Sequence, residues 1–238
     1  MPPLSNTFRT AWQLYSHPRV VVMLFLGFSA GLPYLLVFST LSAWLADADV
    51  DRAAIGYFSW VGIMFSIKVF WAPVVDRLKL PFLDRLLGKR RSWILLAQAG
   101  IATGLYLMAH VDATVAPEMM AFCGLLVAFS SATQDVAIDA YRIEVAEERL
   151  QAALAATYIF GYRLALLVAG AGALYLAEFW SWQVSYEVMA RLVGVGMVTV
   201  PVSYQHLTLP TSDSVYISVV AASCTEAKAT QDFNKYCV

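Results

Sequence analysis

Long uncharged runs alternate with short charged connections along most of this chain. An α-helix rises 1.5 Å per residue, so about 20 consecutive apolar residues cross the hydrocarbon core of a bilayer. Runs of this kind lie at about 20–44, 53–75, 92–110, 117–141, 152–176 and 182–202. The pattern predicts an all-α membrane protein with a bundle of six transmembrane helices over residues 20–202.

Composition agrees with this prediction. The chain is 60% hydrophobic and 14% charged, whereas an ordinary soluble domain has about 25% charged residues. Its net charge of −1 argues against a nucleic-acid partner. Cys123, Cys224 and Cys237 do not have the spacing of a metal site or a disulfide framework. We therefore expect a lipid bilayer as the surroundings and no metal or organic cofactor.

Charges in the connections predict the orientation. The segment 76–91 holds six of the sixteen basic residues, whereas the connections near Asp47 and Asp112 are acidic. Basic connections face the cytoplasm. We therefore expect residues 1–19 to be a cytoplasmic N-terminal segment, followed by a first helix that is not cleaved.

Three ionisable residues lie inside the apolar runs, and ionisable groups at that depth are costly and usually functional. Counting the helical rise from the cytoplasmic ends places Lys68, Asp135 and Arg163 at similar depth, about 10–16 Å into the membrane. We expect these three residues to line a central polar cavity for a polar or anionic substrate. The alternative is a purely structural cluster of ion pairs.

Further charged residues fall at the cytoplasmic ends of the second, third and fourth helices. The helix at 117–141 places Ser131, Asp135, Asp139 and Arg142 on one face. We expect Asp76 to form a salt bridge with Arg142 that latches one conformational state. The alternative is that the basic residues only set topology. The candidate latch comprises Asp76, Arg77, Gly88, Lys89, Arg90, Arg91 and Arg142.

The segment Gly27-Phe28-Ser29-Ala30-Gly31 matches the G-x-S-x-G pattern of serine hydrolases. That pattern requires a strand-turn-helix context, whereas here it lies within a spanning helix. An intramembrane hydrolase using Ser29 is therefore a remote alternative. Close helix packing, or a kink at Pro33, explains these small residues better.

Residues 203–238 differ in character from the rest of the chain. The string VSYQHLTLPT resembles a translated sequencing adapter. We interpret 203–238 as a non-native tail, with a genuine disordered tail as the alternative.

Several segments carry a family resemblance. Asp76-Arg77 followed by Gly88-Lys89-Arg90-Arg91 is similar to a loop signature of the major facilitator superfamily. The segments 27–36, 67–77, 130–144 and 161–177 together resemble the AmpG muropeptide permeases within that superfamily. The resemblance implies a secondary transporter, not an enzyme, in the bacterial inner membrane. Such a permease imports GlcNAc-anhydroMurNAc peptides with protons for peptidoglycan recycling, and is thereby linked to β-lactamase induction.

The resemblance also suggests roles for the candidate residues. Asp135 or Asp139 is expected to carry the coupling proton, and Lys68 and Arg163 to hold substrate carboxylates. An acetyl-CoA transporter or another organic-anion permease is the alternative, because that branch shares the pattern of Gln134, Asp135 and Asp139. Such permeases have two six-helix halves, so we expect a truncated N-terminal half whose missing partner is the second half.

Overall fold

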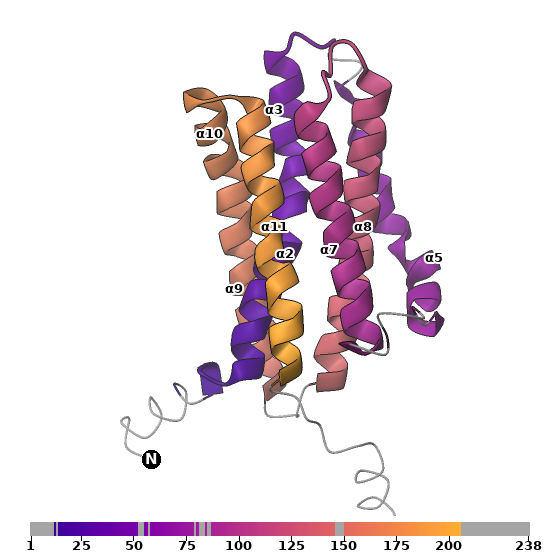
Figure 1. Cartoon of the computed structure of the whole chain (residues 1–238), viewed down its shortest axis with the longest axis vertical. Helices are drawn as coiled ribbons and strands as arrows, with labels where there is room; N and C mark the ends of the chain where they lie inside the picture. The colour runs from indigo at the N-terminus through magenta and orange to yellow at the C-terminus, as the bar shows by residue number, and fades with distance from the viewer. Residues whose placement is uncertain are drawn as a thin grey trace, which may run out of the picture. The chain divides into compact units, whose positions relative to one another are not determined.

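The computed structural model describes residues 12, 14–51, 55–56, 58–78, 80, 84, 87–145 and 150–205. Figure 1 shows the long helices of this part lying side by side. In chain order they are α2 (Pro18–Val37), α3 (Ser39–Asp47), a 3-10 turn (Ser59–Gly62), α5 (Ile63–Arg77), α7 (Lys89–His110), α8 (Pro117–Val145), α9 (Gln151–Leu167), a π turn (Val168–Gly172), α10 (Ala173–Phe179) and α11 (Trp182–Gln205).

Four segments of this described part are long and apolar enough to cross a membrane: Pro18–Asp47, Lys89–His110, Pro117–Glu144 and Gln151–Phe179. The chain is therefore an all-α, multi-pass membrane protein. The runs expected at 53–75 and 182–202 are not among these four. Within 53–75, the described helix α5 has only 15 residues. Within 182–202, α11 carries Glu187 and Arg191 in its first half.

Several helix boundaries differ from the expected ones. The first run forms two helices that are interrupted at Phe38, where the backbone has φ −99° and ψ −85°. The third helix begins at Lys89 rather than at residue 92, directly after Gly88, whose φ of 80° is easily adopted by glycine. The last helix continues to Gln205. Most of the N-terminal segment and residues 206–238 lie outside the described residues.

Glycines bring α2 and α9 into close contact. A Cβ atom added to Gly27 would overlap the carbonyl group of Tyr158, and one added to Gly161 would overlap that of Leu24. A Cβ on Gly31 would lie 2.6 Å from the carbonyl oxygen of Tyr162. Since only glycine allows backbones to approach so closely, the packing interpretation of the small residues around Ser29 is confirmed.

The helix α8 contacts α2, α5 and α7 and, less extensively, α9. Its contact with α7 is also set by a glycine, because a Cβ on Gly104 would lie 2.5 Å from Cγ2 of Val127. Its contact with α5 contains the tilted rings of Trp71 and Phe129, whose centroids are 4.9 Å apart. These two contacts place charged residues of α5 and α7 beside those of α8.

Candidate functional site

Two of the three ionisable residues expected inside the membrane form an ion pair. Lys68 of α5 lies with its Nζ atom 3.5 Å from Oδ2 of Asp135 on α8. Their side chains are 33% and 20% exposed. The other carboxylate oxygen, Oδ1, is buried and has no hydrogen-bond partner among the described residues. One oxygen of Asp135 therefore has unused capacity to accept a hydrogen bond or to bind a proton.

Aromatic residues surround this ion pair. Trp71 lies on the same helix as Lys68, and its buried indole Nε1 atom has no partner in the part of the chain that the structure describes. Tyr158 and Tyr162 of α9 lie within electrostatic range of Asp135. The two tyrosines of α9 and the carboxylate of Asp139 thus all interact electrostatically with the Asp135 carboxylate.

The third residue, Arg163, is not brought to this pair. Its side chain is exposed, and no ion pair involves it among the described residues. Gly161 faces α2, and two residues along a helix turn the direction by about 200°. Arg163 therefore points away from α2, so its equal depth does not bring it next to Asp135.

The remaining candidates on α8 separate into two groups. Asp139 forms an ion pair with Arg142 at 3.2 Å, and the guanidinium of Arg142 lies 6.0 Å from the ring centroid of Tyr158. Gln134 is instead fully buried, and its Nε2 atom donates to Oγ of Ser29 at 3.5 Å. Gln134 thus lies in the protein core, on a different side of α8 from Asp135.

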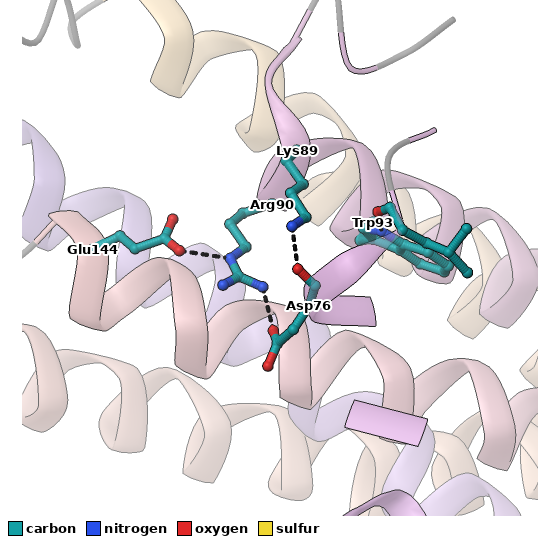
Figure 2. A network of polar contacts seen from close by, with 6 residues as sticks. Asp76, Lys89, Arg90, Trp93 and Glu144 are labelled. Carbon is teal, nitrogen blue, oxygen red and sulfur yellow. Dashed lines mark hydrogen bonds and ion pairs between the residues drawn. The ribbon is translucent and has the colours of Figure 1, made fainter. Parts of the chain in front are cut away.

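A network of charges joins the ends of three helices (Figure 2). Arg90 of α7 donates through Nε to Glu144 of α8 at 2.8 Å and through a terminal nitrogen to Asp76 of α5 at 2.5 Å. Lys89 donates to the backbone carbonyl of Asp76. Trp93 donates to the carbonyl of Leu78 at 3.1 Å. One guanidinium group thereby bridges two carboxylates from different helices.

The expected salt bridge between Asp76 and Arg142 is wrong. Asp76 pairs with Arg90, and Arg142 pairs with Asp139 on its own helix. The reason is the early start of α7. Arg90 belongs to the first turn of that helix rather than to a loop, which places its side chain between the ends of α5 and α8.

Hydrolase chemistry at Ser29 is not supported by the geometry. The Ser29 hydroxyl is fully buried and accepts from the amides of Gln98 and Gln134. An activated serine needs a general base within hydrogen-bond reach, and a glutamine amide cannot accept a proton from it. The Nε2 atom of His110, at the end of α7, instead lies 3.6 Å from a carboxylate oxygen of Glu187.

Sequence reasoning missed Glu144, Tyr158, Tyr162 and Gln98. Glu144 lies beyond the run expected at 117–141, and no spacing rule links it to Arg90. The tyrosines and Gln98 belong to apolar runs in which only charges were considered. A search for uncharged polar side chains within the spans would have found Gln98. Within the described ranges, no group of three or more His, Cys, Asp or Glu side chains is arranged to hold a metal ion.

A comparison with protein families extends this description. A family model described as acetyl-coenzyme A transporter 1 matches residues 19–178. The chain belongs to this family. The matched region of the acetyl-coenzyme A transporter family runs from the start of α2 to α10, so it includes the Lys68–Asp135 ion pair and the whole Arg90 network. Among the described helices, α11 is the one that lies entirely beyond it.

Curated relatives carry the name expected from the sequence. The chain is 37% identical over 188 residues to the putative transporter AmpG 4 of Rickettsia conorii, covering 78% of this chain and 45% of that protein. It is 37% identical over 182 residues to the anhydromuropeptide permease of Escherichia coli K12, covering 76% of this chain and 36% of that permease. The resemblance to AmpG permeases is confirmed, and the chain spans less than half the length of these relatives.

Proposed function

We propose that this chain forms the first six-helix half of a major facilitator transporter that imports anhydromuropeptides with protons across the bacterial inner membrane. The observation that carries the proposal is the ion pair between Lys68 and Asp135. It joins two helices of a membrane protein whose relatives include an anhydromuropeptide permease. Charges inside a membrane are costly, and where they persist they usually line substrate or ion paths.

Asp135 is the proposed site of the coupling proton. One of its oxygens is paired with Lys68, and the other is buried without a hydrogen-bond partner among the described residues. Protonation of the carboxylate would weaken its attraction to the ammonium group and leave Lys68 able to bind a carboxylate of the muropeptide. Asp139 is the weaker candidate, because it is already paired with Arg142 and lies nearer the end of α8.

Arg163 supports the proposal that a second half completes the site. Its charge lies on an exposed face of α9 that also carries Ile159, Phe160 and Leu167. A guanidinium group on an apolar face at membrane depth needs an anionic partner or water. A second six-helix half would supply a carboxylate or enclose a hydrated cavity there.

The proposed orientation places the N-terminus in the cytoplasm. The ends of α5, α7 and α8 that carry Arg77, Lys89, Arg90 and Arg142 would face the same compartment, in agreement with the distribution of basic residues. The Arg90 network would then brace the cytoplasmic ends of these helices, and its rearrangement would accompany opening on that side.

Uptake of radiolabelled anhydromuropeptide tests the proposal in cells that lack their own permease. The chain is expressed alone and as a fusion of residues 18–202 to the remaining part of the Escherichia coli permease. We expect the fusion to restore uptake and Asp135→Asn to lower the uptake rate at least about tenfold at equal membrane content, which corresponds to a transport barrier higher by about 1.4 kcal/mol. Asp112→Asn, in the turn between α7 and α8, is the matched control.

Two results would contradict this function. One is a fusion that is inserted normally and transports nothing, and the other is unchanged uptake by Asp135→Asn. Comparison with Asp139→Asn then shows which carboxylate couples the proton. The outcome for Asp139→Asn is expected to be the smaller loss, because Asp139 has its own arginine partner.

A second candidate cargo is acetyl-coenzyme A, because the matching family model carries that transporter's name. Both cargoes are anionic and would suit Lys68 and Arg163. Competition distinguishes them: excess unlabelled acetyl-coenzyme A should leave muropeptide uptake unchanged if the first proposal is right. Strong competition would favour the second.

A further inference from the structure

A buried, uncharged polar cluster lies where four helices meet. Ser29 of α2, Gln98 of α7 and Gln134 of α8 are each fully buried. The Nε2 atom of Gln98 donates to Oγ of Ser29 at 3.2 Å, and that of Gln134 donates to the same oxygen at 3.5 Å. Gly196 of α11 closes the cluster, because a Cβ there would overlap Ser29 and the amide of Gln98.

This cluster has more hydrogen-bonding capacity than its members can satisfy. The Oε1 atoms of Gln98 and Gln134 are both buried and have no partner within the described part of the chain. The Ser29 hydroxyl offers a single donor, which can serve only one of the two amide oxygens. Rotating either amide by 180° exchanges its oxygen and nitrogen. A different atom of that amide then lacks a hydrogen-bond partner, so the cluster still contains unsatisfied polar atoms.

We propose that Ser29, Gln98 and Gln134 form a polar hub that binds one water molecule and fixes the rotation of α8. A water molecule has two donors for the two amide oxygens, and buried waters typically make about three hydrogen bonds to groups that are otherwise unsatisfied. A larger ligand is excluded because Gly196 lies against Ser29 and Gln98, and both glutamine amides already contact Ser29.

The polar hub sets the direction of the neighbouring carboxylate. Gln134 and Asp135 are consecutive on α8, so their side chains point about 100° apart. Anchoring Gln134 to α2 and α7 therefore holds Asp135 toward Lys68 of α5. Hydrogen bonds between uncharged polar side chains of different helices contribute to helix association in membrane proteins. The inference concerns the folded bundle and does not rest on the proposed cargo.

The first experiment tests the ligand. A high-resolution structure of the purified chain in a lipid phase should show a solvent peak within hydrogen-bond distance of both amide oxygens. Gln98→Met keeps the side-chain length and removes its hydrogen bonds, so the peak should disappear in that variant. Amide groups that pack directly against protein atoms, with no solvent peak in the wild-type chain, would overturn the proposed water site.

The second experiment tests the rotation of α8. Ala137 is fully buried on α8. In a background in which Cys123, Cys224 and Cys237 are all replaced by alanine, Ala137→Cys reports the accessibility of this position to a membrane-permeant thiol reagent. We expect Gln134→Met, or Gln98→Met if the former does not fold, to raise the labelling rate several-fold. Ile101→Ala is the matched control, since it removes buried packing from α7 one turn from Gln98 without removing a hydrogen bond.

The control separates rotation from general loosening. A hub variant should label faster than Ile101→Ala even where the two lower the thermal midpoint equally. Equal labelling at an equal midpoint would mean that the cluster contributes only to packing, and would overturn the orienting role. Because neither readout requires transport, the hub can fail while the proposed function stands, and the reverse also holds.

Discussion

The two sides of α8 are built differently. Toward α7, the contact is the more extensive one and is set by small residues, with Gly104 against Val127. Toward α5, the contact is formed by an aromatic pair and by the Lys68–Asp135 ion pair at 3.5 Å. Close backbone packing favours a single arrangement, whereas an ion pair with an unpartnered oxygen can exchange partners. The comparison indicates that α7 and α8 form a fixed unit and that α5 is the helix able to shift against it.

The largest expected effect comes from breaking the α5 side. Lys68→Met leaves the Asp135 carboxylate without its cation, and removing one partner of a buried pair costs on the order of 3 kcal/mol. The cost is smaller here because the Lys68 side chain is a third exposed. We expect Lys68→Met to lower the thermal midpoint of the purified chain markedly, as measured by thermal unfolding.

The double variant Lys68→Met/Asp135→Asn is the control for this loss. It removes both charges, so it should recover most of the stability that the single variant loses. If the double variant is as unstable as Lys68→Met, the loss arises from packing around Lys68 rather than from an unpaired charge.

The next largest effect is expected on the α7 side. Gly104→Ala would press its Cβ against Val127 and should cost about 1–3 kcal/mol, as is usual for overpacking. Gly124→Ala on α8 is the matched control, since a Cβ there meets no atom within 4 Å. It should be neutral or slightly stabilising because alanine favours helices. Equal thermal midpoints for the two variants would contradict a tightly fixed α7–α8 unit.

A smaller effect is expected where the Arg90 network bridges both sides. Arg90→Lys keeps the charge but loses the planar fork that reaches Asp76 and Glu144 together. Since about half of each of these carboxylate side chains is exposed, the loss should be about 0.5–1 kcal/mol. A cycle with Glu144→Gln measures it. No coupling between positions 90 and 144 would show that the bridge adds nothing to stability.

The smallest effect concerns the turn between α7 and α8. The Asp112 carboxylate accepts from the Thr114 hydroxyl at 2.6 Å and from its backbone nitrogen at 2.9 Å, and these hydrogen bonds lower the pKa of Asp112. A carboxyl whose pKa is lowered by folding stabilises the folded chain at pH values above its pKa in the unfolded chain, about 3.9. This stabilisation is lost as the pH falls through its lower pKa in the folded chain.

Thr114→Ala tests this contribution. The variant should have a slightly lower thermal midpoint than the wild-type chain at pH 7. When the pH is lowered to about 3, its thermal midpoint should fall by less than that of the wild-type chain. Identical pH dependence in the two proteins would show that the hydrogen bond from the Thr114 hydroxyl does not stabilise the turn.

Hydrophobic patterning predicted where most helices lie, because the length of an apolar run reports directly on a membrane span. It also predicted the depth of Lys68, Asp135 and Arg163, since depth follows from helical rise. Direction around a helix does not follow from rise. The glycine contacts of α2 and α9 decide that direction for Arg163, and these depend on a partner helix that no local pattern identifies.

The same limit explains the network at the helix ends. Asp76 and Arg142 were expected to meet because they lie at the same level, but the start of α7 at Lys89 brought Arg90 between them. That start depends on Gly88 adopting a positive φ. In the sequence alone, a basic run after a glycine is as typical of a loop as of the start of a helix. Ser29 was recognised as a packing residue, whereas its glutamine partners carry no charge and drew no attention.

The interruption at Phe38 has a mechanical consequence. At that level the carbonyl of Leu36 accepts from the hydroxyl of Tyr186 at 2.7 Å, and Thr40 donates to the carbonyl of Ala169 at 2.9 Å within the π turn. Side chains have thus taken over part of the bonding that a continuous helix would provide. The neighbouring first and fifth spans share a joint at one height, so each can bend there without breaking further backbone hydrogen bonds. A displacement of one end of the first and fifth spans would therefore bend them at this level, and the other end would move less.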